Sequence, residues 1–186
     1  LHPRVRRQRQ MCIRDRNRTL PLNTSWAYTH YGVSHTLLLF SVLSFSTICV
    51  KLYASEVFII IFLWIGILLV PLAYLSYRNQ RRKLNFESTP TTLDKQAIYD
   101  KICKLADYYD WDIDHCGDDC IVAHTNPAIW HLTWGEQIFI VFDKSQVWIN
   151  SVNDLNKRTS PFSFGYAKRN IRRIREALTQ DVTIRD

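Results

Sequence analysis

Two long uncharged stretches constrain the fold of this chain more than any other feature. Lys, Arg, Asp and Glu are absent from Thr19 to Val50 and again from Val57 to Tyr77, and the second stretch is dominated by large apolar residues. A transmembrane helix needs about 20 mainly apolar residues to cross a hydrocarbon core about 30 Å thick. Both stretches are long enough, and the six residues between them, KLYASE, allow only a tight connection. We therefore predict an antiparallel pair of membrane-spanning helices.

The charges that flank this pair predict its orientation. Arg78, Arg81, Arg82 and Lys83 follow the second stretch at once, whereas the connection holds one Lys and one Glu. Because basic flanks stay on the cytoplasmic side, we predict a multi-pass protein of the plasma (inner) membrane with both termini cytoplasmic. The spans lack the ionisable residues that mark ion or proton paths. The pattern therefore favours an anchor over a pore.

The basic character of the chain belongs to its N-terminal half. Residues 1–87 hold twelve Lys and Arg against three Asp and Glu, whereas residues 88–186 hold twelve against fourteen. Much of the excess lies in residues 4–16, RVRRQRQMCIRDR, which resemble translated sequencing-adapter sequence and therefore predict nothing about the fold. The alternative is a basic arm that binds lipid or nucleic acid. In either case the composition predicts a disordered or artefactual segment over residues 1–32.

The remaining chain divides into three parts. Residues 33–77 form the predicted transmembrane hairpin, residues 78–91 a basic juxtamembrane linker, and residues 92–186 a cytoplasmic α+β domain. That domain begins with a predicted helix, capped by Thr91 or Thr92. Apolar residues recur along one face of this helix at Leu93, Ala97, Ile102, Leu105, Ala106 and Tyr109.

Short apolar runs after this helix predict an antiparallel sheet of four to five strands. They are Trp111–Cys116, Cys120–Thr125, Ile129–Thr133, Gln137–Phe142 and Gln146–Val152. A C-terminal helix follows, with Ala167, Ile171, Ile174 and Leu178 on one stripe. The fold class is thus a membrane helical hairpin plus α+β, with an N-terminal and a C-terminal helix flanking the sheet.

The other face of this sheet poses a question, because Phe139 and Val141 or their neighbours need a cover there. A second copy, the membrane surface or a partner would supply it. A bent sheet or a long loop of the same chain is the alternative.

Few residue patterns indicate catalysis or metal binding. Cys116, Cys120 and His124 form the most metal-like group, but their spacing is wider than the CxxC pairs of zinc sites. The chain has five glycines, and none forms a phosphate-binding loop. We therefore assign no catalytic, metal or cofactor residues and predict no cofactor. The alternating acids Asp110, Asp112 and Asp114 fit a solvated strand edge.

Two basic groups are the candidate lipid or partner contacts. One follows the second span and the other lies on the last helix: Arg78, Arg81, Arg82, Lys83, Lys168, Arg169, Arg172, Arg173 and Arg175. Near an anionic membrane each basic residue contributes about 1 kcal/mol of binding. A plain solvated helix face is the alternative for the second group. Nucleic acid is not a predicted partner, because the domain is net negative.

Three short motifs carry a resemblance. They are W-G-E at Trp134–Glu136, N-S at Asn150–Ser151, and S-F-G-x-x-K-x-N at Ser163–Asn170. With the two spans, they resemble uncharacterised small bacterial membrane proteins that have two N-terminal transmembrane helices and a cytosolic α+β tail domain. The resemblance implies architecture only.

The function that we predict is a membrane-anchored cytoplasmic binding or regulatory module. It would act by self-association or partner recruitment at the membrane surface, as a homodimer or with a protein partner through the sheet face. The alternative is a small membrane-tethered enzyme or metal-binding protein that uses Cys116, Cys120, His124 or Glu136. Glu136, the one acid among the middle strands, is the first residue to mutate if activity is found.

Overall fold

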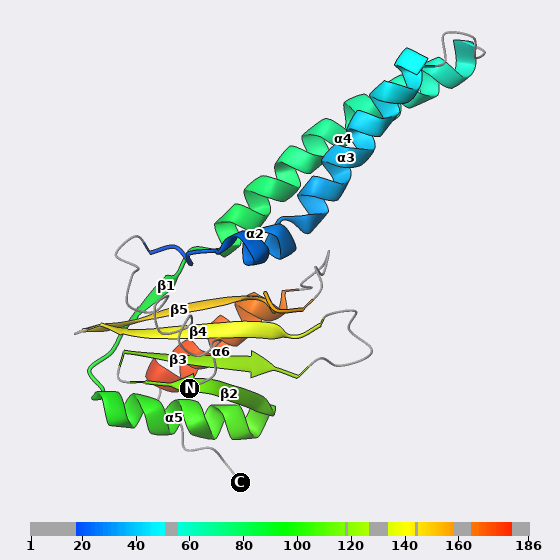
Figure 1. Ribbon diagram of the computed structural model, residues 1–186. Coiled ribbons are helices and arrows are strands. Elements are labelled where there is room, and N and C mark those ends of the chain that lie inside the picture. Colours follow the sequence, from blue (N-terminus) through cyan, green and yellow to red (C-terminus); the bar gives the residue numbers. More distant parts are fainter. Residues whose placement is uncertain are drawn as a thin grey trace.

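The computed structural model describes residues 18–50, 56–117, 119–126, 134–143, 145–157 and 165–179, without the side chains of 48–50 and 56–59. Over these residues the chain forms five helices and a five-stranded antiparallel sheet (Figure 1). The predicted α+β class, the antiparallel sheet and its two flanking helices are confirmed.

Two long helices project together from the sheet. They are α3 (Gly32–Val50) and α4 (Glu56–Lys83), which lie side by side (Figure 1). The Ser41 hydroxyl donates to the Gly66 carbonyl at 3.2 Å. A Cβ on Gly66 would lie 2.9 Å from the tip of the Phe45 ring, so this ring would have to shift if the glycine were replaced.

The outer surface of this helix pair is apolar. Large side chains such as Trp64 (67% exposed) and Leu68 (62% exposed) point away from the protein. Within the described ranges one segment, Ile60–Lys83, is long and apolar enough to cross a membrane, and Gly32–Thr47 is apolar but shorter.

The sheet has the strand order β1-β5-β4-β3-β2, with every neighbouring pair antiparallel. Its strands are β1 (Glu87–Pro90), β2 (Trp111–Cys116), β3 (Cys120–Thr125), β4 (Glu136–Asp143) and β5 (Gln146–Asn153). The predicted strand Ile129–Thr133 falls outside the described residues.

Strand β1 lies where the sequence predicted a linker. Helix α4 runs on to Lys83, and only three residues separate it from β1. The apolar helix therefore enters the sheet almost directly.

Helices α5 (Lys95–Tyr109) and α6 (Tyr166–Thr179) flank the sheet on one face. Between them and the strands lies the main apolar core, which includes Ile102, Ile138 and Ile174, each fully buried. The cap of α5 differs from the prediction, because the Asp94 carboxylate accepts from the Ala97 amide at 2.8 Å. The Thr91 hydroxyl instead accepts from the Leu93 amide at 3.2 Å, before the helix begins at Lys95.

The opposite face of the sheet is covered by the chain itself. Leu20, Leu84 and Trp26, the last from helix α2 (Thr24–His30), form a second core with side chains of three central strands. Those strand residues are Val122, Phe139 and Val152. Phe139 is 2% exposed, so its side chain offers almost no surface to a partner.

The segments before α3 and after α4 are joined at the base of the helix pair. The Leu20 amide donates to the Leu84 carbonyl, and the Phe86 amide to the Arg18 carbonyl, both at 2.8 Å. Residues 18–31, predicted as part of a disordered or artefactual segment, thus form a bridge and a helix. The physical reason is that Leu20 and Trp26 bury apolar surface against the sheet, while Asn23 caps α2.

Candidate functional site

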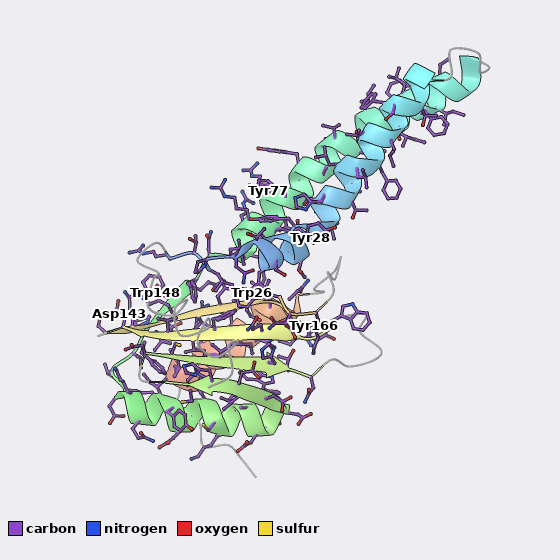
Figure 2. The ribbon with its side chains drawn as sticks, viewed as in Figure 1. Trp26, Tyr28, Tyr77, Asp143, Trp148 and Tyr166 are labelled. Carbon is purple, nitrogen blue, oxygen red and sulfur yellow. The ribbon has the colours of Figure 1, made fainter. Side chains whose placement is uncertain are left out.

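Glu136 is the centre of a buried polar cluster at one end of the sheet. It begins β4, at the end of the sheet near Tyr166 and opposite Asp143 and Trp148 (Figure 2). Its Oε2 accepts from the Ser151 hydroxyl at 3.0 Å and from the Asn170 side-chain amide at 2.8 Å. These three residues come from β4, β5 and α6. The three motifs noted in the sequence therefore converge at one point.

The environment of Glu136 is strongly perturbed. The residue is 2% exposed, and its Oε1 has no hydrogen-bond partner within the described part of the chain. Burial raises the pKa of Glu136 to about 7, against the opposing effects of the Ser151 hydrogen bond, the Lys83 charge and the Asn170 hydrogen bond. The carboxyl group can therefore gain or lose a proton near neutral pH.

Glu136 also stabilises the start of a helix. The backbone N–H of Ala167, in the first turn of α6, is close enough to favour the ionised carboxylate and so to oppose the rise in its pKa. Because the first N–H groups of a helix lack partners within it, a carboxylate there satisfies one of them and complements the helix dipole. Ser163, the first residue of the third motif, lies outside the described residues. This contact shows how the cluster holds α6 on the sheet.

A second charged cluster surrounds His124 on the other face of the sheet. Its Nδ1 lies 3.3 Å from Oδ2 of Asp154, which is 4% exposed. Its Nε2 lies 2.6 Å from Oδ2 of Asp114, without the alignment of a hydrogen bond. The Lys157 ammonium completes the group, 3.4 Å from the same Asp154 oxygen. Asp114 is thus an ion-pair partner and not only a solvated edge residue.

The two carboxylates favour a charged imidazole. Burial lowers the pKa of His124, but the hydrogen bond and charge of Asp154 and the charge of Asp114 outweigh it and bring the pKa above its ordinary value. Burial raises the pKa of Asp154, and the hydrogen bonds from His124 and Asn156 outweigh it and bring the pKa below its ordinary value. Both ring nitrogens of His124 face carboxylates, which leaves neither in position to act as a metal ligand.

The metal-like group from the sequence does not come together. Strand β3 places Cys120 and His124 at its two ends, roughly 13 Å apart at 3.3 Å per residue. Cys120 is buried and disulfide-bonded, so its sulfur is not a free ligand. Across the described ranges, no three His, Cys, Asp or Glu side chains are arranged to hold a metal ion.

The basic residues separate into two sets. Arg78, Arg81 and Arg82 are exposed on the last turns of α4, and Lys168 and Arg169 are exposed at the start of α6, while Lys83 is half-buried. Those further along α6 already have partners within the domain: Arg172 pairs with Glu176, Arg173 lies over the Tyr109 ring, and Arg175 bonds to Glu87 at 2.6 Å. The predicted basic face of α6 is therefore smaller than the sequence suggested.

Several buried polar residues could not have been found from the sequence. Gln137 and Asn150 are fully buried on the α2 side of the sheet, and neither Gln137 amide atom has a partner within the described ranges. The Trp26 indole N–H donates to Asn156 at 3.2 Å, which ties α2 to the turn that follows β5. Such contacts depend on strand register and on the path of residues 18–31, and no local motif signals them.

Comparisons with protein families, with curated proteins and with solved structures found no match to this chain.

Proposed function

We propose that this chain is a membrane-anchored binding module, with α3 and α4 inserted in the bilayer and the α+β domain held at the cytoplasmic surface. The observation that carries the proposal is the apolar surface of the helix pair. Leu39, Leu68 and Trp64 are 57%, 62% and 67% exposed. An apolar surface of this extent is a liability in water and is matched by lipid.

The base of the helix pair supports an orientation with both termini in the cytoplasm of a bacterial cell. Tyr28 and Tyr77 both lie toward this end of the helix pair (Figure 2), and aromatic side chains of this kind are enriched at membrane interfaces. Exposed Arg78, Arg81 and Arg82 follow at the same end. Arginine near a span is retained on the cytoplasmic side, and this supports a cytoplasmic location for the domain.

A binding or regulatory role agrees with the fact that the reactive side chains Glu136 and His124 are engaged in contacts within the domain. Glu136 and His124 are bonded within the domain, and Phe139 is covered by residues 18–31. We therefore place the partner surface at the exposed basic end near the membrane, where Arg78, Arg81 and Arg82 meet the headgroup region. The sheet face is the less favoured surface for a homodimer.

A matched pair of arginine substitutions tests the membrane insertion. Leu68 is 62% exposed on α4 and Tyr108 is 68% exposed on α5. Arginine in place of leucine at the centre of a span costs about 3 kcal/mol of insertion free energy. Leu68→Arg should therefore lower the insertion of α4 in a translation-insertion assay, while Tyr108→Arg should leave it unchanged. Equal effects, or wild-type protein that stays soluble without detergent, would contradict the proposal.

A reporter fused after Asp186 tests the orientation. The proposal predicts a cytoplasmic reporter, and replacement of Arg78, Arg81 and Arg82 by glutamate should move a part of it across the membrane. An external reporter in the wild-type protein would overturn the assignment.

Sedimentation of the full chain in detergent tests self-association. A strict monomer at high concentration would leave a protein partner as the only form of the proposal.

A further inference from the structure

A continuous chain of contacts links His124 to helix α2. Asp154 follows β5 directly and begins a turn, in which its Oδ1 accepts from the Asn156 amide at 2.9 Å and its carbonyl from the Lys157 amide at 3.2 Å. On the far side of this turn, the Asn156 side chain accepts from the Trp26 indole N–H at 3.2 Å. The turn after β5 therefore lies between His124, which contacts Asp154, and Trp26 on α2.

Helix α2 continues this chain of contacts to the base of the helix pair. Trp26 is 8% exposed and belongs to the second core together with Leu155 of the same turn. At the C-terminal end of α2, Nε2 of His30 lies 2.8 Å from the Gln80 carbonyl oxygen of α4. A shift of the turn would therefore reach α2 and, through it, the base of α4.

The proton on His124 decides how well the turn is held against β3. The ring lies between two carboxylates, with Nδ1 3.3 Å from Asp154 and Nε2 2.6 Å from Asp114. An imidazolium has a positive charge and an N–H on both nitrogens, whereas a neutral imidazole has one N–H and one bare acceptor nitrogen. Loss of the proton would therefore leave two like charges across a neutral ring, one of them facing a lone pair.

The groups around His124 favour its protonated form. Strand β4 places neutral Gln137 opposite His124, and α2 carries no Lys, Arg, Asp or Glu. Burial lowers the pKa of His124, but the neighbouring carboxylates outweigh it and bring the pKa above 6.5. The contribution of the imidazolium is therefore complete at low pH and is lost as the pH rises through this raised pKa. The charged groups that face the ring from β2 and from the turn are Asp112, Asp114, Asp154 and Lys157.

The α2 side of the sheet also contains a polar group that water would stabilise. Gln137 is fully buried between His124 and Val152, and neither of its amide atoms has a hydrogen-bond partner within the described ranges. A buried polar group without a partner costs free energy that it regains in water. Lifting of α2 would bring water closer to this amide, and this gain offsets part of the apolar contact that α2 loses.

We propose that His124 is a pH-sensitive switch for the docking of α2. The protonated imidazole holds the turn after β5 in the position in which Asn156 binds Trp26, and loss of the proton at higher pH weakens the hold of the sheet on α2. Because His30 of α2 contacts α4, the same change would loosen the base of the helix pair. The switch does not depend on membrane insertion, since its contacts join α2 to the sheet.

Hydrogen exchange of the full chain in detergent, followed by mass spectrometry at pH 6 and pH 8.5, tests this switch. After correction for intrinsic exchange rates, the α2 amides of the wild-type chain should be about tenfold less protected at pH 8.5, a size typical of one hydrogen bond to a charged group. His124→Gln should show the lower protection at both pH values. His124→Lys keeps a positive charge at both and should keep α2 protected at both.

Two other groups that titrate in this range are separated from His124 by sign and by a control. Burial lowers the pKa of His30, so its titration would increase the protection of α2 as the pH rises, opposite to the expected change. Glu136→Gln removes the carboxyl group with a pKa of about 7 on the other face of the sheet, and it should leave the response of α2 as in the wild type. Equal protection of wild-type α2 at the two pH values would overturn the proposal. So would a full response in His124→Gln, or loss of the response in Glu136→Gln.

Discussion

The buried carboxyl group of Glu136 should make the stability of the domain depend on pH in an unusual direction. Its pKa is raised from 4.5 to about 7. At a pH below the ordinary pKa of 4.5, Glu136 is protonated in both the folded and the unfolded chain, so its burial costs no stability through ionisation. As the pH rises, the unfolded chain releases its proton first and stability falls, until the folded chain also ionises near pH 7. The total loss is about 3 kcal/mol at 1.4 kcal/mol per unit.

Glu136→Gln removes this dependence while keeping the shape of the side chain. The amide still offers an acceptor to Ser151 or Asn170, and it carries no charge to bury. Relative to wild type, the free energy of unfolding of the variant should increase by about 2.5 kcal/mol between pH 5 and pH 8. Chemical denaturation of the full chain in detergent, followed by circular dichroism at both pH values, measures this difference. Titration of His124 and Asp154 cancels, because both proteins contain them.

Glu176→Gln is the control for this experiment. Glu176 is on α6 and exposed, and its contact with Arg172 is a surface pair of 3.6 Å. Its replacement should change stability by less than about 1 kcal/mol at either pH. If Glu136→Gln shows the same small and pH-independent difference, then burial does not hold the proton on Glu136 and the reasoning fails.

Two further predictions concern the packing of the domain. Trp26→Ala should lower the free energy of unfolding by about 3–5 kcal/mol, because it empties part of the second core and breaks the hydrogen bond to Asn156. Thermal unfolding measures this loss of stability. A loss below about 1 kcal/mol would show that α2 does not cover the sheet in solution. Gly135→Ala should cost more stability than Gly165→Ala, although both glycines have positive φ. The new Cβ would clash with the Thr125 carbonyl oxygen at the first site, whereas at the second it would meet nothing within 4 Å among the described residues. Equal losses in the two alanine variants would contradict the tight contact at Gly135.

Periodic patterns predicted the elements of this domain well. Alternating and continuous apolar runs indicated β2, β3, β4 and β5, and helical spacing indicated α5 and α6. These signals are local, since each depends on which side chains of one segment face a core. Strand β1 was missed because its sequence, Glu-Ser-Thr-Pro, is polar, and only its pairing with β5 makes it a strand.

Contacts between distant segments could not be predicted in the same way. The role of Trp26 depends on the turn that follows β5, 130 residues later in the chain. Glu136 was singled out as the one acid among the middle strands, but its partners Ser151 and Asn170 are fixed by strand register and by the position of α6. The shift in register within β2 also has no signal in the sequence, although it decides which face carries Cys116.

The short junction between α4 and β1 couples the tilt of the helix pair to the orientation of the sheet. A helix of 28 residues is about 42 Å long, so a change in its tilt of 10° displaces its far end by roughly 7 Å. With three residues before the sheet and two hydrogen bonds across the base, little of that rotation can be absorbed at the joint. Helices tilt when bilayer thickness changes. If the helix pair is inserted in a membrane, a change in bilayer thickness would therefore change the angle between the domain and the membrane surface.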